Sequence, residues 1–481
     1  MNKKAVFSNL IWRFAERTGA QLVSLIVSIV LARLLDPSSY GTVALILSFT
    51  AILQVFVDSG LGNALIQKKN ADDLDFSSVF YVNLVFCFGL YCLLFLFSPL
   101  IADFYRTPEL ANYIRVLGVT ILISGIKNVQ QAYVSRNLLF KKFFFATLIG
   151  TIIAGVSGVA LAIAGYGIWA LIAQQLINLT IDTMVLWLTV KWRPIRAFSF
   201  ARIKALFSYG WKLLVAALIE TANNNLRSLI IGKVYTSADL GYYNQGEKFP
   251  KMIAQNANAS IDSVLLPVLS NVQDDKESVK SMMRRSIGVS TYVMAPLMLG
   301  MFFCAKSIVS FLLTEKWIDC VFYLRLFCLS YVFYPIHTAN LNAIKAIGRS
   351  GLFLKLEVVK KIVGIIALII SVFISVEAMA VSMVLTSFVC QVINAYPNKR
   401  LLNYGYIDQI KDIIPSIFAA LVMGMCVYPI QLFGFSNFTT LCIQIPLGAL
   451  LYIALSNILH ISSYYYLLGV IKSFRDSFSK K

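Results

Sequence analysis

Two stretches of this chain are so long and so free of charge that they decide what it can fold into. Residues 143–181 contain no charged side chain over 39 positions, and residues 413–471 contain none over 59. A helix needs about 20 apolar residues to cross a bilayer, so each stretch is long enough for two crossings. Each is also interrupted by turn-forming residues, the first at Gly165 and Gly167 and the second near Gly434. Both stretches therefore predict pairs of membrane-spanning helices.

The composition extends this prediction to the whole chain. Hydrophobic residues make up 58% of the 481 positions and charged residues 14%, against about 45–50% and 25% in soluble domains. Applying the same length rule throughout predicts fourteen spans, at 10–34, 40–66, 76–100, 111–136, 143–164, 166–190, 205–232, 240–269, 286–313, 321–344, 356–376, 378–396, 411–431 and 437–460. Little chain remains for a soluble catalytic domain, so we expect the protein not to be an enzyme.

The placement of the positive charge predicts the orientation of the spans. The net charge is +19, and an excess of Lys and Arg marks the cytoplasmic connections of membrane proteins. With the N-terminus inside, the inner segments hold 31 of the 42 cations and the outer connections and adjoining helix ends hold seven. We therefore expect both termini in the cytoplasm and no binding of nucleic acid.

A weak internal repeat predicts how the spans are grouped. "LARLLDPSSYG" before position 42 is similar to "IIGKVYTSADLG" before position 242, and "NYIRVL" at 112–117 matches "FYLRLF" at 322–327, an offset of 210. An even number of spans in each copy means that both enter from the same side. The prediction is an all-α fold with two six-helix lobes, 1–200 and 201–398, related by pseudo-two-fold symmetry, and two additional helices with a basic cytoplasmic tail in 399–481.

Polar side chains inside the predicted helices indicate where function lies, because ionisable groups at membrane depth are costly unless they face a partner or water. The predicted helix at 240–269 places six of them on one face at steps of three and four residues: Asn244, Lys248, Lys251, Gln255, Asn258 and Asp262. Shorter stripes recur on three other helices, with Arg17, Gln21, Ser24 and Ser28, with Thr50, Gln54 and Asp58, and with Glu220, Asn224 and Arg227. These four helices, the first pair of each lobe, are predicted to surround a hydrated cavity between the lobes.

Several of these residues have a simpler interpretation, and the sequence leaves both open. Arg17 lies close enough to the inner face to extend toward the membrane surface. Glu220 could pair with Arg227, and Glu247 could neutralise Lys251 at i,i+4. Lys127 lies on the helix at 111–136, and the offset of 210 relates it to His337, which is either a packed residue or a proton carrier.

Motifs for metals and nucleotides are missing from the sequence. The eight cysteines and two histidines have no metal-ligand spacing, and no G-x-x-x-x-G-K-[ST] loop is present. We therefore predict no catalytic residues, no metal and no cofactor.

Three stretches carry a resemblance to a known family: "LARLLDPSSYGTVAL" at 31–45, "VFVDSGLGNALIQ" at 55–67 and "GYGIWALIAQQL" at 165–176. They resemble the polysaccharide transporters of the multidrug/oligosaccharidyl-lipid/polysaccharide exporter superfamily, in particular the Wzx-like flippases for O-antigen, colanic-acid and exopolysaccharide units. The resemblance implies a fold like that of the multidrug exporters of the superfamily (MATE), in a bacterial inner membrane. It also implies movement of undecaprenyl-diphosphate-linked repeat units from the cytoplasmic to the periplasmic leaflet.

This resemblance suggests roles for the polar stripes. Arg and Lys bind phosphate oxygens through charge-assisted hydrogen bonds, so we expect the diphosphate near Arg227, Lys248 and Lys251, with Arg17 at the cytoplasmic entrance. The expected hydrogen-bond partners of the sugars are Asn224, Gln255 and Asn258, and Gln21 would line the same cavity. The candidates for coupling to an energy source are Asp58, Glu220, Lys127 and His337. The expected partners are the lipid-linked oligosaccharide and membrane lipid, with association to a polymerase left open.

Two other functions compete with this hypothesis. A membrane polymerase or ligase that joins lipid-linked sugars would need a sizeable outer segment, whereas the predicted outer connections are short. A cation-coupled drug exporter of the same superfamily would share the fold, but we expect its cavity to be more acidic or aromatic.

Overall fold

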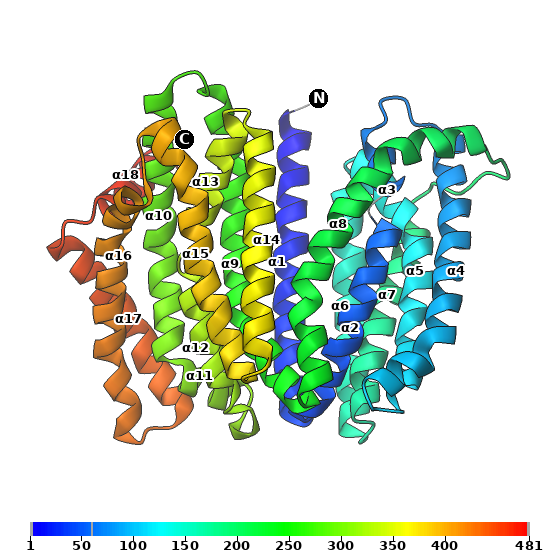
Figure 1. Cartoon of the computed structure of the whole chain (residues 1–481), viewed down its shortest axis with the longest axis horizontal. Helices are drawn as coiled ribbons and strands as arrows, with labels where there is room; N and C mark the ends of the chain where they lie inside the picture. The colour runs from blue at the N-terminus through cyan, green and yellow to red at the C-terminus, as the bar shows by residue number, and fades with distance from the viewer. Residues whose placement is uncertain (1–2, 59–60, 479–481) are drawn as a thin grey trace. The chain divides into compact units, whose positions relative to one another are not determined.

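The structure is a computed structural model that describes residues 3–58 and 61–478, with the side chains of 19–57, 61–208, 210–263 and 265–473. Across these ranges the regular structure consists of eighteen α-helices and two short 3-10 helices, with no strand. This arrangement satisfies the backbone hydrogen bonds within each segment, as a chain in hydrocarbon requires. The all-α prediction is confirmed (Figure 1).

Ten helical segments in the described part of the chain are long and apolar enough to cross a membrane. They are Pro37–Val57, Asp73–Phe104, Leu110–Arg136, Phe140–Ile163, Ile168–Thr189, Lys276–Phe303, Cys320–Ala346, Val376–Leu402, Tyr406–Phe433 and Asn437–Ile458. The other four predicted segments also fall on helices, two of which carry the polar stripe at 244–262 and the charged residues at 355–361. The chain is therefore a multi-pass membrane protein, and the count of fourteen spans stays a prediction.

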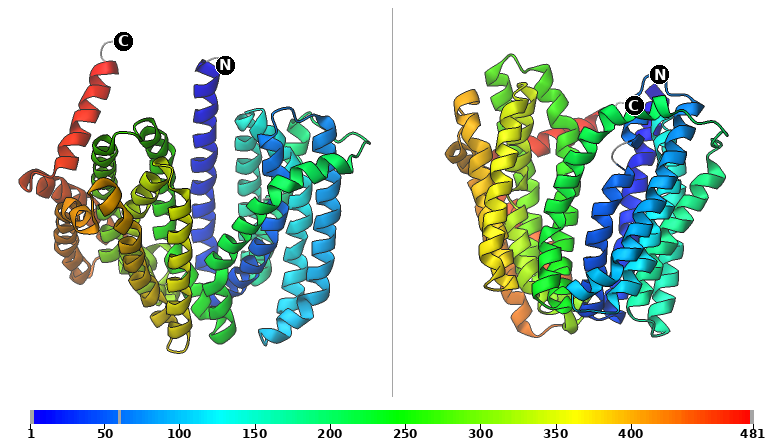
Figure 2. Two further views of the ribbon diagram at one scale, coloured as in Figure 1. Left: turned by 45° about the horizontal axis from the view of Figure 1, so that its top comes forward. Right: turned by 45° about the vertical axis from the view of Figure 1, so that its right-hand side comes forward.

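The chain forms two compact units, Met1–Gly241 and Tyr242–Lys481. The first contains the helices α1 (Lys3–Leu34), α2 (Pro37–Asp58), α3 (Leu61–Gln67), α4 (Asp73–Phe104), α5 (Leu110–Arg136), α6 (Phe140–Ile163), α7 (Ile168–Thr189) and α8 (Phe200–Val234). Within it α6 packs against α1 and α7, and α2 packs against α5, α7 and α8. Figure 2 shows this bundle from two further sides. Helix α8 has two straight parts, 200–208 and 210–234, at an angle of 52°.

Glycines allow α6 to lie close to both of its neighbours. A Cβ atom on Gly155 would overlap the side chain of Val27 in α1. A Cβ atom on Gly150 would lie 3.0 Å from the backbone oxygen of Asn178 and 3.2 Å from the backbone nitrogen of Asp182, both in α7. Small residues of this kind let membrane helices approach until their backbones touch. The close approach fixes the position of the polar side chains that α7 carries.

The second unit contains most of α9 (Ser237–Asn271) and all later helices: α10 (Lys276–Phe303), α11 (Ala305–Leu312), α12 (Cys320–Tyr331), α13 (Tyr334–Ala346), α14 (Ser350–Val372), α15 (Val376–Leu402), α16 (Tyr406–Val427), α17 (Asn437–Ile458) and α18 (Ser462–Phe478). Within it α10 packs against α12, α13 and α16. The sequence did not predict α18, which contacts α10, where Tyr464 lies beside Tyr292. The uncharged run at 413–471 ends in this helix, so its last part forms neither of the two predicted spans.

The helix bounds repeat with the offset found in the sequence. Helix α5 covers Leu110–Arg136, and the segment Cys320–Ala346, formed by α12 and α13, lies 210 residues later at both ends. Helix α6 begins at Phe140 and α14 at Ser350, again 210 residues apart. The segment is interrupted after Tyr331, before Pro335, whereas α5 is continuous. The division into 1–200, 201–398 and 399–481 stays a prediction.

Candidate functional site in the membrane helices

A charged pair joins α5 and α7 inside the first unit. The Nζ atom of Lys127 donates a hydrogen bond to Oδ2 of Asp182 over 2.5 Å. The two side chains are only 13% and 11% exposed, and Oδ1 of Asp182 is buried without a hydrogen-bond partner. Removing one partner of such a pair leaves an uncompensated buried charge. The pair therefore holds together two helices that are separated in the sequence by α6.

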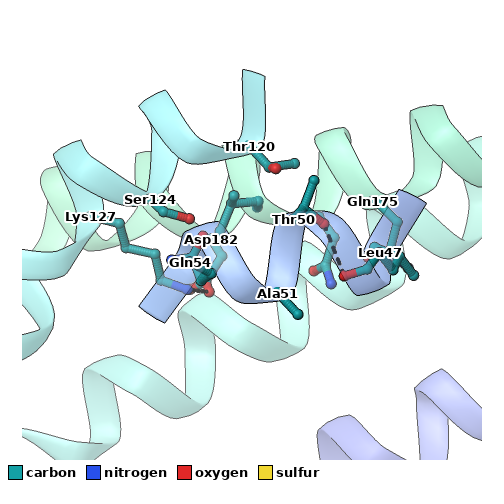
Figure 3. A pocket seen from close by; sticks show the side chains of 11 residues that line it. Leu47, Thr50, Ala51, Gln54, Thr120, Ser124, Lys127, Gln175 and Asp182 are labelled. Carbon is teal, nitrogen blue, oxygen red and sulfur yellow. Dashed lines mark hydrogen bonds and ion pairs between the residues drawn. The ribbon is translucent and has the colours of Figure 1, made fainter. Parts of the chain in front are cut away.

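A polar pocket of about 380 Å³ lies beside this pair, lined by α2, α5 and α7. Besides Lys127 and Asp182, its polar side chains are Thr50, Gln54, Thr120, Ser124, Gln175 and Asn178. Figure 3 shows Lys127 and Asp182 directed toward one another, close to Gln54 and Ser124. A pocket with this lining offers hydrogen-bond donors and acceptors at membrane depth.

Sequence reasoning missed Asp182, although the sequence contains a signal for it. Asp182 is the one charged residue in 143–190, and it follows Gln175 and Asn178 at steps of three and four, which places the three on one helix face. An isolated carboxylate inside an apolar span requires a partner. Lys127, which the sequence does identify, is that partner.

The predicted face of α9 makes contacts within the second unit. Lys251 donates to Oε2 of Glu247 over 3.2 Å, so the i,i+4 pair is present. The hydroxyl of Tyr331 in α12 donates to the other oxygen of Glu247 over 2.9 Å. Asn258 accepts a hydrogen bond from Thr338 in α13. These contacts attach one side of α9 to α12 and α13.

The remaining residues of this face differ in exposure. Asp262 accepts a hydrogen bond from Asn342 over 2.7 Å. Lys248 is half-buried, and Gln255 is exposed. Exposure along this face therefore alternates, with Lys248, Lys251 and Asn258 half-buried and Gln255 and Asp262 exposed.

Helices α1, α2 and α8 hold the predicted residues of the first unit. Asn224 is exposed and donates to Glu220, also exposed, over 3.3 Å. Arg227 and Gln21 are half-buried. The side chains of Arg17 and Asp58 lie outside the described residues, so their roles stay predictions.

His337 is half-buried in the second unit and contacts a neutral amide group. Its Nδ1 atom lies 2.8 Å from Nδ2 of Asn394 in α15. One turn along α13, Asn340 exchanges hydrogen bonds with Gln409 and accepts one from Asn398. The geometry therefore gives His337 a hydrogen-bond partner, and its suggested role in coupling stays a prediction.

Comparison with known proteins adds the family to this geometry. Residues 30–322 match the family described as "Polysaccharide biosynthesis protein". The chain belongs to this family. The predicted relation to proteins of polysaccharide biosynthesis is confirmed.

Two curated relatives match at similar identity but over different lengths of the chain. The "Succinoglycan biosynthesis transport protein ExoT" of Rhizobium meliloti (strain 1021) is 25% identical over 66% of this chain, and the match spans 64% of that protein. The "Lipopolysaccharide biosynthesis protein WzxC" of Escherichia coli (strain K12) is 24% identical over 84% of this chain and 80% of its own length.

Solved structures show the same fold. The "Lipid II flippase MurJ, inward closed conformation" matches with a TM-score of 0.75 and 16% identity, covering 93% of this chain and 98% of that one. The inward-facing structure of a multidrug resistance MATE family transporter matches with a TM-score of 0.61 and 14% identity, over 80% of this chain and 94% of that one. These likenesses support the predicted fold class.

Proposed function

We propose that this protein is a flippase that moves undecaprenyl-diphosphate-linked polysaccharide repeat units from the cytoplasmic to the periplasmic leaflet of a bacterial inner membrane. It acts as a transporter and not as an enzyme. Both termini face the cytoplasm, and the two lobes open alternately to either side. Family membership supports the role in polysaccharide biosynthesis, and the names of two relatives, a transport protein and a lipid II flippase, support transport of a lipid-linked sugar.

The observation that carries the proposal is the set of cationic side chains on two polar membrane helices. Arg227 on α8 and Lys248 on α9 are half-buried, and Lys251 lies one turn beyond Lys248. A cation at membrane depth lowers the cost of bringing a diphosphate out of water, and its N–H groups can bind the phosphate oxygens. We propose that these residues bind the diphosphate in one hydrated cavity, that Arg17 guides its entry, and that Gln21, Asn224, Gln255 and Asn258 contact the sugars.

Lys251 differs from a free cation because the carboxylate of Glu247 already neutralises its charge. A diphosphate that approaches Lys251 has to compete with the carboxylate of Glu247, which Tyr331 holds from its other side. We therefore propose that Lys251 contributes less to the affinity for the diphosphate than it would without Glu247. The membrane potential, or protons carried by Asp58, Glu220, Lys127 or His337, would supply the direction of transport.

The proposal is tested by deleting the gene in its host and following lipid-linked repeat units. Accumulation of these units in the cytoplasmic leaflet supports it, whereas shortened glycan that still reaches the surface favours a polymerase. Arg227→Ala and Lys248→Ala should each lower glycan export about tenfold or more, as expected when a charge-assisted hydrogen bond is lost. Lys280→Ala, on the first turn of α10, serves as the control. Normal export by Arg227→Ala, Lys248→Ala and Lys251→Ala at unchanged protein level would defeat the assignment.

A further inference from the structure

We propose that the pocket between α2, α5 and α7 binds a neutral sugar ring of the transported glycan. This inference rests on the proposed function and adds a sugar subsite inside the first unit. Its residues are different from the cations that we assign to the diphosphate. The argument uses the charge, the hydrogen-bonding groups and the size of the pocket.

The charge of the pocket selects the class of ligand. Its charged lining residues are Lys127 and Asp182, which are bonded to one another, so their formal charges cancel. A phosphate needs a surplus of positive charge, and a divalent cation needs a surplus of carboxylate oxygens. Neither surplus is present among the lining residues. The pocket therefore favours an uncharged ligand that can hydrogen-bond.

The free hydrogen-bonding groups of the pocket match a polyhydroxylated ligand. The side chains of Ser124, Gln175 and Asn178 make no hydrogen bond with another described residue. Each amide presents both donors and an acceptor, and each hydroxyl both donates and accepts. A sugar ring presents hydroxyl groups with the same double capacity. In an apolar membrane segment such groups are costly to leave unpaired, and a bound sugar would satisfy them.

The two threonines of the pocket are oriented by their own helices. The hydroxyl of Thr120 donates to the carbonyl oxygen of Leu117 over 2.6 Å, and that of Thr50 donates to the carbonyl oxygen of Ile46 over 3.2 Å. A hydroxyl group has a single hydrogen, which each threonine uses for its own helix. The two hydroxyl oxygens can therefore only accept hydrogen bonds from a ligand. Lys127 uses one N–H bond for Asp182 and has further donors. The pocket thus offers fixed acceptors and a fixed donor.

The size and the walls of the pocket fit one ring. Its volume is about 380 Å³, near the lower end of the roughly 300–1,000 Å³ found for small-molecule sites. Leu47, Ala51 and Leu179 supply an apolar wall. Such a wall suits the C–H face of a sugar, whose hydroxyl groups extend from the ring edge.

A binding experiment tests the subsite directly. The purified protein in lipid nanodiscs is mixed with methyl glycosides of glucose, galactose and N-acetylglucosamine, and saturation transfer to each glycoside is measured by NMR. We expect transfer to at least one of them, reduced fivefold or more in Thr50→Val/Thr120→Val. The matched control is Thr151→Val/Thr183→Val, whose buried hydroxyls also donate to backbone carbonyls of their own helix but do not line the pocket. No transfer with any glycoside, or equal transfer in both double variants, would overturn the proposal.

An export experiment separates a sugar subsite from a purely structural ion pair. The variant Lys127→Met/Asp182→Leu removes both charges together and leaves neither of them unpaired. If the pocket binds sugar, this variant should export glycan at least tenfold more slowly than the wild type at equal protein level, and it should also lose saturation transfer to the glycoside, which a coupling role of Lys127 alone would leave intact. If the pair serves stability alone, the double variant exports normally and the subsite is rejected. In that case wild-type export still depends on the gene, so the proposed flippase function would stand.

Discussion

Lys127 and His337 occupy the same place in the two halves of the repeat, 210 residues apart, but they are held in different ways. In the first unit Lys127 on α5 forms an ion pair with Asp182 on α7. In the second unit His337 on α13 contacts the amide of Asn394 on α15 over 2.8 Å. Each unit contains a trio of consecutive helices related by the repeat, α5 to α7 in the first unit and α13 to α15 in the second. In both units the contact connects the first helix of the trio with the third. Both units therefore have a cross-helix contact at this position, charged in the first unit and with a neutral amide in the second.

The two contacts differ in how much stability the protein loses when one partner is removed. A neutral pair that loses one member leaves a polar group unpaired, whereas a broken ion pair leaves a full charge in the protein interior. The second unit adds a buried neutral network of Asn340, Asn398 and Gln409 near its pair. The first unit places its charged pair against an open polar pocket. The contact that is more costly to break, the ion pair, thus lies beside the pocket to which we assign a sugar ring.

The largest expected effect comes from breaking the two contacts with the same substitution. Asp182→Leu leaves the ammonium group of Lys127 unpaired and should lower the free energy of unfolding by about 3–5 kcal/mol. Asn394→Leu removes a neutral partner of the His337 imidazole and should cost about 1–3 kcal/mol. Unfolding by SDS, followed by circular dichroism in mixed micelles, measures both.

A third variant sharpens this comparison. Lys127→Met/Asp182→Leu should recover most of the stability lost in Asp182→Leu, because both charges are removed and the replacements are apolar. Equal losses for Asp182→Leu and Asn394→Leu would show that the Lys127–Asp182 pair is not a buried ion pair in the membrane.

The sequence was sufficient to predict the fold class because membrane-spanning helices are recognisable as long apolar runs that end at charged or turn-forming residues. The prediction of spans at 111–136, 143–164 and 166–190 lies within a few residues of α5, α6 and α7. The offset of 210 also follows from the sequence, since the helix ends repeat with it. What the runs do not encode is a break inside one helix, such as the one before Pro335, or an additional helix such as α18.

The candidate site was harder to predict because a helix stripe identifies a face but not its neighbour. The stripe on α9 identified Lys251, and the sequence offered Glu247 as one partner, but Tyr331 lies 84 residues from Glu247 and could be placed only by packing. Lys127 was identified as a cation at membrane depth, but its partner Asp182 is on a helix that looked almost uncharged. Pairings between distant helices depend on three-dimensional packing, which periodicity alone does not supply.

A second comparison concerns how closely the middle helix of each trio is packed. In the first unit a methyl group on Gly155 of α6 would overlap Val27, whose β-branched side chain is stiff. In the second unit a methyl group on Gly364 of α14 would lie 4.0 Å from Cγ2 of Thr386, an ordinary contact. Gly155→Ala should therefore destabilise by about 1–3 kcal/mol through overpacking. Gly364→Ala should be neutral or stabilising by up to about 1 kcal/mol, because alanine favours a helix.

Thermal unfolding of the two alanine variants in the same detergent measures this difference. A stabilising Gly155→Ala would mean that α1 and α6 are less closely packed than the structure indicates. A strongly destabilising Gly364→Ala would instead show that α14 and α15 pack as tightly as α6 does with its neighbours.

The smallest expected effect compares Asp72 and Asp275, the residues that cap α4 and α10 and directly precede the two apolar spans. Asp72 accepts hydrogen bonds from the guanidinium of Arg202, over 2.5 Å, and from the backbone N–H of Asp75. These two contacts, the one with Arg202 first, lower the pKa of Asp72 to about 2. Asp275 caps α10, and the hydroxyl of Ser278 is the main cause of its lowered pKa. The side-chain partner of the first cap is therefore a cation, Arg202, whereas that of the second cap is a neutral hydroxyl group, Ser278.

The sign of the pH dependence follows from these lowered pKa values. A carboxylate whose pKa is lower in the folded protein stabilises it above the ordinary pKa of about 4, and this contribution is lost as the pH falls. For Asp72 the loss should extend from about pH 4 down to about 2. Asp72→Asn should thus lower the unfolding temperature at pH 6 and have no effect near pH 2, with a cost below about 1 kcal/mol because the pair is exposed.

Arg202→Gln removes the cationic partner of Asp72, together with the longer contact of 3.3 Å between Arg202 and Oδ1 of Asp75. Removing the guanidinium should raise the pKa of Asp72 toward its ordinary value, so that the variant loses the contribution of Asp72 at a higher pH than the wild type does. Asp275→Asn has no comparable cation to lose, so its effect should be insensitive to Arg202→Gln when the two are combined. Unfolding temperatures of the single and double variants, measured from pH 2 to pH 7 in detergent, give both comparisons. If the unfolding temperature falls at the same pH with and without Arg202, the backbone hydrogen bond of the cap, and not the ion pair, lowers the pKa of Asp72.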